Sequence, residues 1–144
     1  MENEKRFLVT SINREAISRS ENSLLEQGYF DLVESSRTFR IRITDNEIAE
    51  AVFKEGNGFS RPEKSCDIKD LPLARFLLGE TSHILEKIRY FPDYPIEDAV
   101  LTIDVYEQPL SGIIIAEVEF NDTNVIESPE SIIKPVLDTD ILHS

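Results

Sequence analysis

The sequence predicts a mainly β domain of the α+β class, in which eight antiparallel strands close into a barrel and a few helices cover it. Eight segments alternate between apolar and polar residues with the period of a β-strand, and most of them concentrate charged residues on one face. With 144 residues, of which 40% are hydrophobic, the chain has the length and composition of one domain spanning residues 1–144.

The eight predicted strands are rich in β-branched and aromatic residues, and turn residues separate them. They lie near residues 2–10, 28–33, 37–44, 48–55, 61–67, 83–90, 97–106 and 112–120. Gly56-Asn57-Gly58 and Pro92 are examples of the intervening turn signals. This pattern is typical of strands joined by hairpin connections.

Three segments have helical features. Residues 13–27 contain good helix formers and are followed by a glycine, so we expect a helix there. Asp70 can cap a short helix through Leu78, with Pro72 in its first turn and Gly79 after its end. Ser128-Pro129-Glu130 has the composition of a further helix start.

Charged residues gather on one row of each strand. In residues 37–44, Arg40 and Arg42 share a row, and Phe39 and Ile41 lie on the other. For one strand, the simplest interpretation is a sheet with one face in water. The rows together hold the bases Arg6, Arg40, Arg42, Lys54, Arg61, Lys87 and Arg89 and the acids Glu2, Glu4, Glu63, Asp104, Glu117 and Glu119.

These seven bases and six acids leave one net positive charge, whereas the whole chain carries −13. If the strands close with the charged rows inward, the apolar rows face outward and the helices can cover them. The interior would then be locally basic in an acidic protein.

Such an interior suits a small polyphosphate and a divalent cation. Arginine guanidinium groups bind phosphate oxygens through two parallel hydrogen bonds, and lysine adds a point charge. Carboxylates two residues apart on a strand point the same way, about 7 Å apart, so two of them can reach one hard cation. We therefore expect Mg²⁺ or Mn²⁺ as the cofactor.

Charge and apolar content restrict the partners and the compartment. The net charge of −13 repels nucleic acid and anionic membranes, so we expect neither as a partner. The longest apolar stretch, around residues 113–116, is far shorter than the roughly 20 residues that span a bilayer. The first residues are charged and lack the apolar core of a secretory signal. Cys66 is the single cysteine, so it cannot form a disulfide within the chain, which agrees with a reducing compartment. We expect a cytoplasmic protein.

The charged rows occur in motifs that resemble those of the CYTH domain family, also called triphosphate tunnel metalloenzymes. The segment ENEKRFLV is similar to the family's opening ExExK strand, with Arg6 in place of the lysine. Further matches, in order up to residue 120, are EQGYF, FRIRI, AVFK, RPEKS, EKIRY, IDVY and AEVEF. Two departures are Ser65, where the family has an acid, and the tail VLDTDILHS, which lacks the family's usual ending.

The resemblance implies an eight-stranded antiparallel tunnel and metal-dependent action on triphosphates. The predicted substrate-binding residues are Arg6, Arg40, Arg42, Lys54, Arg61, Lys87 and Arg89. The predicted metal ligands are Glu2, Glu4, Glu63, Asp104, Glu117 and Glu119. Of these acids, we expect Glu4, Glu117 and Glu119 to be catalytic as well.

Hydrolysis of short polyphosphates, above all inorganic triphosphate, is the leading hypothesis, with water as the nucleophile. A thiamine or nucleoside triphosphatase and an adenylate cyclase of the same fold stay open, although the chain lacks tryptophan, the strongest stacking surface for an organic group. Ser65 and the tail leave an alternative of another class, a polyphosphate-binding module with weakened turnover. A homodimer also stays open.

Overall fold

The computed structural model describes residues 2–9, 15, 17–30, 37–56, 60–93, 99–107, 109–120 and 142–143, apart from the side chains of residues 2, 3, 60, 61, 142 and 143. Within these residues, it contains ten strands and one helix. The mainly β class that the sequence predicts is confirmed.

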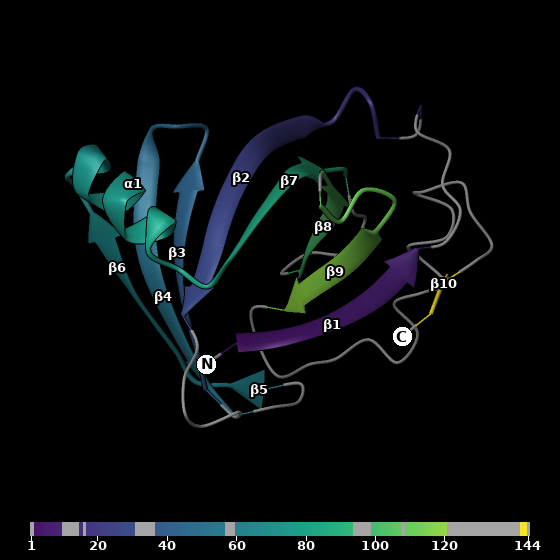
Figure 1. Ribbon diagram of the computed structural model, residues 1–144. Helices are drawn as coiled ribbons and strands as arrows, with labels where there is room; N and C mark the ends of the chain where they lie inside the picture. The colour runs from purple at the N-terminus through teal and green to yellow at the C-terminus, as the bar shows by residue number, and fades with distance from the viewer. Residues whose placement is uncertain are drawn as a thin grey trace.

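Eight of the strands are six or more residues long and form one antiparallel sheet. They are β1 (Glu2–Val9), β2 (Glu21–Phe30), β3 (Arg37–Thr44), β4 (Ile48–Glu55), β6 (Glu63–Ile68), β7 (His83–Phe91), β8 (Ala99–Tyr106) and β9 (Ile114–Phe120). Their order is β1-β9-β8-β7-β2-β3-β4-β6. Two short strands, β5 (Ser60–Arg61) and β10 (Leu142–His143), pair with β1. Figure 1 shows the sheet curling around on itself.

The part of the sheet that the structure describes is a curled half-barrel rather than the predicted closed barrel. Within the described residues, β1 and β6 are joined only through β5, which pairs Glu2 with Arg61 and Asn3 with Ser60. Pro62 separates β5 from β6, and proline has no backbone N–H to donate to a ladder. The strand predicted at residues 61–67 is therefore split, and the described pairing of β1 with β5 covers two residues.

The helix predicted at residues 13–27 is wrong where the structure describes that segment. Residues 17–20 form a turn, and β2 begins at Glu21. Because β2 pairs with β7 on one side and with β3 on the other, its backbone hydrogen bonds are satisfied as a strand. This two-sided pairing outweighs the intrinsic helix preference of Leu24 and Leu25.

The strand predicted at residues 28–33 begins seven residues earlier than expected, since β2 covers Glu21–Phe30, and residues 31–33 lie outside the described residues. The other predicted strands agree closely with the structure. The strands at residues 37–44 and 48–55 have the predicted bounds. Those near residues 2–10, 83–90 and 112–120 differ only at their ends. The alternation of apolar and charged residues therefore located most of the sheet.

The predicted short helix is confirmed as α1 (Leu71–Gly79). The side chain of Asp70 caps it, because a carboxylate oxygen accepts a hydrogen bond from the backbone N of Leu73 at 3.1 Å. Pro72 lies in the first turn, where its missing N–H costs nothing. The further helix start at Ser128-Pro129-Glu130 lies outside the described residues.

The apolar rows of the strands face outward and form two cores. The first, on β1, β8 and β9, consists of Phe7, Val9, Ile17, Leu101, Ile103, Val105, Ile114, Ala116, Val118 and Phe120. The second lies where α1 covers β3 and β4, and consists of Ile41, Ile43, Ala49, Ala74 and Leu78. The inner rows are thereby left for charged residues, as predicted. Among the residues that can be described, no helix has the length and apolar character needed to cross a membrane.

Candidate functional site

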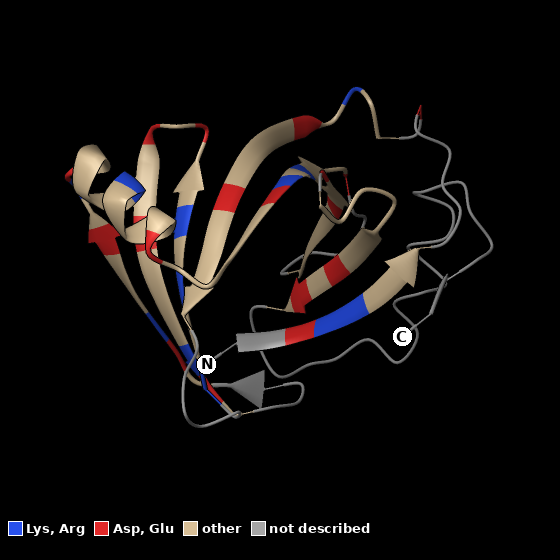
Figure 2. Cartoon of the chain, in the orientation of Figure 1, with Lys and Arg blue, Asp and Glu red and all other residues tan. Residues whose placement is uncertain are grey.

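The inner face of the sheet forms a cavity of about 140 Å³. The residues lining it are Arg6, Tyr29, Arg40, Arg42, Lys54, Glu63, Lys87, Arg89, Tyr106, Glu117 and Glu119. Six of them are bases, three are acids and two are tyrosines. Figure 2 shows basic and acidic positions on the strands around this face. The lining is therefore almost entirely charged, with an excess of positive groups.

The register of the sheet brings these residues together, because side chains directly opposite each other on neighbouring strands lie on the same face. The opposed pairs are Arg6 with Glu117, Tyr29 with Arg40, Lys54 with Glu63, Lys87 with Tyr106, and Arg89 with Asp104. Each of the eight long strands contributes one or two residues to this lining.

Asp104 holds two of the cavity's bases. Its Oδ1 and Oδ2 accept hydrogen bonds from Nε and Nη2 of Arg89 at 2.8 and 2.9 Å, and Nζ of Lys87 lies 2.7 Å from Oδ2. Burial opposes the charge of Asp104, yet the hydrogen bonds and the charge of Arg89 hold its pKa below the usual value. Burial lowers the pKa of Lys87 to about 8, against the opposing effect of Asp104. The carboxylate thus keeps both bases charged at neutral pH.

Arg40 and Arg42 lie two residues apart on the inner row of β3 and both line the cavity. Burial, together with the charges of Arg40 and Arg89, lowers the pKa of Arg42 to about 10. Nε of Arg42 donates a hydrogen bond to Oε1 of Gln27 at 3.3 Å, and Nη1 lies 3.6 Å from Glu50. Nε of Arg40 is buried and has no hydrogen-bond partner among the described residues. An anion at this position would relieve the repulsion.

Glu4 on β1 and Glu117 on β9 are diagonal neighbours on the inner face of the sheet. Burial raises the pKa of Glu4 to about 8, and the neighbouring carboxyl of Glu117 adds to this effect. Burial works against ionisation of Glu117 too, yet its contacts with Glu4 and Arg6 hold its pKa below the usual value. Nε of Arg6 donates to Glu117 at 2.9 Å. Without a cation, Glu4 therefore carries the proton of this pair at neutral pH, and binding of a divalent cation would release that proton.

The acidic side of the cavity has ligands that fit a hard divalent cation. Glu4 lies directly opposite Glu119 in the sheet, and Glu117 is one step along the same row. Oε2 of Glu4 is buried without a hydrogen-bond partner among the described residues, so a cation would satisfy it. Within those residues, no three Asp, Glu, His or Cys side chains already converge as a metal site.

The structure brings most of the predicted site residues together. All of the predicted bases except Arg61 line the cavity, as do Glu63, Glu117 and Glu119. Glu4 contacts Glu117, and Asp104 contacts Lys87 and Arg89. The side chains of Arg61 and Glu2 lie outside the described part of the chain. The roles assigned to these residues stay predictions.

Three residues of the site were not predicted: Gln27, Tyr29 and Tyr106. Tyr29 and Tyr106 line the cavity, and Gln27 is buried beside Arg42. The period-2 signal could have found Tyr106, because it lies two residues after Asp104 on the same strand. Gln27 was hidden because its segment was assigned to a helix.

Several solved structures resemble this chain. An adenylyl cyclase candidate from Hippeastrum with a dominant triphosphatase activity superposes with a TM-score of 0.69 at 16% identity, over 96% of this chain and 87% of that protein. A protein from Pyrococcus horikoshii gives a TM-score of 0.67 at 21% identity, over 96% of this chain and 87% of its own. An inorganic triphosphatase gives 0.59 at 23% identity, over 91% of this chain and 79% of its own.

The chain shares the fold of these three proteins. At the level of the fold, this confirms the resemblance that the motifs indicate. No protein-family model matches the sequence, and no curated protein matches it.

Proposed function

We propose that the chain is a metal-dependent hydrolase of short polyphosphates, with inorganic triphosphate as its substrate. The observation that carries this proposal is a pair of buried atoms without a hydrogen-bond partner among the described side chains, Nε of Arg40 and Oε2 of Glu4. Buried polar groups are nearly always paired. One atom is a donor on the basic side of the cavity and the other is an acceptor on its acidic side, so a bound polyphosphate and its cation would satisfy both.

The composition of the cavity favours an inorganic substrate. Its lining contains nine charged residues and two tyrosines, and no aliphatic side chain. An organic group attached to the triphosphate would gain little in such a lining, because it would find no apolar surface to bury. A linear triphosphate instead presents phosphate oxygens to the surrounding bases along its whole length.

Phosphoryl transfer requires positioning and charge stabilisation more than covalent chemistry. Arg40, Arg42 and Arg89 offer donors for the oxygens of the transferred phosphoryl group, and Lys54 and Lys87 add positive charge. Water is the proposed nucleophile, since no nucleophilic side chain is needed for this reaction class.

The proposed metal ligands are Glu4, Glu117 and Glu119, with Glu2, Glu63 and Asp104 as the other predicted members. When bound, Mg²⁺ or Mn²⁺ would neutralise phosphate charge and increase the acidity of a bound water. Both oxygens of Asp104 already accept hydrogen bonds from Arg89, so it would have to exchange these partners to reach a cation.

The names of two proteins with this fold support the proposal. One is an inorganic triphosphatase, and the other has a dominant triphosphatase activity. Both are less than 25% identical to this chain, so the assignment of the activity to this chain rests on the cavity.

A polyphosphate-binding module without turnover is the second candidate, and Ser65 is the observation that favours it. Ser65 is exposed on the inner row of β6, opposite Val52 and two residues from Glu63. The motif resemblance has an acid at this position. A site with one carboxylate fewer would bind phosphate through its bases while holding the catalytic cation less tightly.

Phosphate release from triphosphate, pyrophosphate, ATP and thiamine triphosphate, each with Mg²⁺ and with Mn²⁺, tests the proposed function. We expect release from inorganic triphosphate in the presence of metal. In Glu4→Gln, turnover should fall much more than triphosphate affinity, because the bases that bind phosphate are unchanged. Glu86→Gln, an exposed glutamate on the outer row of β7, is the matched control and should keep wild-type turnover.

The outcomes separate the two candidates. Release that does not require metal would contradict the proposed mechanism. Tight triphosphate binding without release would establish the binding module, and Ser65→Glu should then restore activity if the missing acid is what limits it.

A further inference from the structure

Gln27 is an uncharged residue buried among the bases of the cavity. It is 1% exposed, and it lies on the inner row of β2 directly opposite Arg42. Its Oε1 accepts a hydrogen bond from Nε of Arg42 at 3.3 Å, and its Nε2 donates one to the hydroxyl oxygen of Tyr29 at 3.0 Å. One amide therefore contacts two residues that line the cavity.

The chemistry of the three side chains allows only one orientation of this amide. Arginine has donors and no acceptor, so the oxygen of Gln27 must face Arg42. The NH₂ group then faces Tyr29, whose oxygen must act as the acceptor. Because Gln27 occupies that oxygen as a donor, the hydroxyl hydrogen of Tyr29 is directed away from Gln27, toward the cavity that Tyr29 lines.

The same contact orients Arg42. With Nε engaged by Gln27, the guanidinium plane is held by a neutral acceptor. Because Nη1 lies 3.6 Å from Glu50, Nη2 is the donor of Arg42 that is left for a ligand. A carboxylate at position 27 would hold the plane equally well, but it would cancel the charge of Arg42 and accept the proton of Tyr29. A neutral amide is the group that fixes both side chains while keeping both as donors.

We propose that Gln27 is a positioning residue that directs Nη2 of Arg42 and the hydroxyl of Tyr29 toward the same polyphosphate. This inference rests on the proposed function for the identity of the ligand. It adds Tyr29 to the phosphate-binding groups as an uncharged donor, and it places Gln27 behind the site without contact to the substrate. Tyr29 also lies directly opposite Arg40, so three donors from β2 and β3 converge.

A double-mutant cycle with inorganic triphosphate as the titrant tests the inference. Gln27→Leu removes the amide at nearly constant volume, and Tyr29→Phe removes only the hydroxyl. Loss of a hydrogen bond to a charged group corresponds to about tenfold in affinity, so we expect about tenfold weaker binding for Gln27→Leu. Tyr29→Phe should weaken binding in the wild-type background and have little further effect beside Gln27→Leu, because the hydroxyl is no longer directed.

Asn22→Leu is the matched control, because Asn22 is an exposed amide on the outer row of the same strand. It should bind triphosphate as the wild type does. A purely structural role for Gln27 would lower thermal stability and leave the affinity of the folded protein unchanged, and that result would overturn the inference. The inference would also be overturned if the fold-losses in triphosphate affinity of Gln27→Leu and Tyr29→Phe multiplied in the double variant, because the two side chains would then act independently.

A second measurement does not depend on the ligand. The Nε–H resonance of Arg42, assigned by its loss in Arg42→Lys, should shift and exchange faster with water in Gln27→Leu than in the wild type. An unchanged resonance would contradict the contact, whatever the ligand does. Wild-type protein that neither binds nor hydrolyses triphosphate would overturn the proposed function instead, and the resonance would still decide the role of Gln27 in orienting Arg42.

Discussion

Asp104 is the residue on which the charge balance of the cavity depends. It is 4% exposed and contacts two bases that are themselves largely buried, Lys87 and Arg89. Two buried cations share one carboxylate, so neither could be accommodated at this depth without it. The proposed phosphate-binding residues Lys87 and Arg89 are therefore held in place by an acid that is not itself proposed to bind phosphate.

Removal of this carboxylate should destabilise the fold. In Asp104→Asn the side chain keeps its size, but Lys87 and Arg89 are left without a compensating charge, and we expect a loss of about 3 kcal/mol in the free energy of unfolding. Glu55→Gln is the control, because the Arg37–Glu55 pair is exposed and should contribute no more than about 1 kcal/mol. Urea denaturation measures both variants. Equal losses would show that Asp104 does not balance the buried bases.

Among individual residues, the sequence predicted those whose place on the inner or outer face of the sheet follows from strand periodicity. Arg40 and Arg42 are two apart between outward apolar neighbours, so their shared face could be stated without a structure. Gln27 and Tyr29 share a face for the same reason, but only in a strand. The helix predicted at residues 13–27 concealed this shared face, because helix-forming residues such as Leu24 and Leu25 dominate the sequence pattern of the segment.

Among the elements, β2 connects the cavity to the outer packing within three consecutive residues. Gln27 and Tyr29 face the cavity, and Gly28 between them faces outward. A Cβ at Gly28 would overlap the side chain of Thr81, which follows α1 and donates a hydrogen bond to the carbonyl of Leu78. Glycine is required here for space, because the connection after α1 packs directly on the strand.

Substitution at Gly28 should therefore disturb the strand that carries Gln27. We expect Gly28→Ala to lower stability by about 1–3 kcal/mol, since backbone and Thr81 must move apart. Gly79→Ala is the control, because a Cβ there meets nothing within 4 Å and the residue lies at the end of α1. That variant should be neutral or slightly stabilising. Thermal unfolding of both proteins distinguishes a packing requirement from a general preference for glycine.

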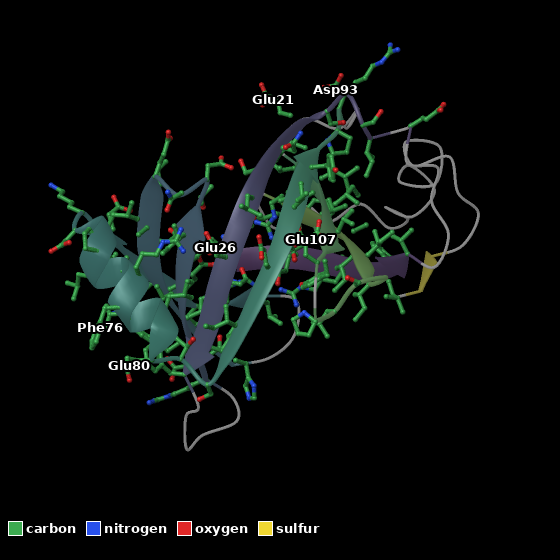
Figure 3. The ribbon with its side chains drawn as sticks, turned by 45° about the horizontal axis from the view of Figure 1, so that its top comes forward. Glu21, Glu26, Phe76, Glu80, Asp93 and Glu107 are labelled. Atoms are coloured by element: carbon green, nitrogen blue, oxygen red, sulfur yellow. The ribbon has the colours of Figure 1, made fainter. Side chains whose placement is uncertain are left out.

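α1 is tied to the sheet by a charged contact as well as by its apolar face. Nη1 and Nη2 of Arg75 donate to the carboxylate oxygens of Glu26 on β2 at 2.7 and 2.8 Å, and Nη2 also contacts Asn46 in the turn between β3 and β4. Figure 3 shows Glu26 on the side of β2 that faces α1. The contact joins three elements, and it is partly exposed.

This contact should make stability depend on pH in one direction. The hydrogen bond from Arg75 lowers the pKa of Glu26 below about 4.5, its value in an unfolded chain. A lowered folded-state pKa contributes stability above the unfolded value, and that contribution is lost as the pH falls through the folded value. The free energy of unfolding of the wild type should exceed that of Glu26→Gln by about 1 kcal/mol at pH 7, and this difference should disappear below pH 4. An advantage that persists in acid would exclude the charged contact as its source.

For the whole molecule, the fold separates charge between its interior and the rest of the chain. The protein carries −13 overall, yet six of the eleven residues lining its cavity are bases. The excess of acid elsewhere repels large polyanions, whereas a small anion that enters the curled sheet meets donors on several strands. The sequence predicted this separation because the charged rows could be counted. It did not predict the open sheet, because closure depends on how closely strands that are distant in the sequence approach each other, and the described pairing of β1 with β5 covers only two residues.

The central claim is that the cavity binds triphosphate through bases on its inner face, and calorimetric titration of the wild type, Arg40→Met and Arg37→Met tests it most directly. Arg40 lines the cavity, whereas Arg37 lies three residues away on the outer row of the same strand and pairs with Glu55. Both variants lose the same charge. We predict that Arg40→Met binds triphosphate at least about tenfold more weakly than the wild type, while Arg37→Met retains wild-type affinity. Equal affinities in the three proteins, or no binding by the wild type, would contradict the claim.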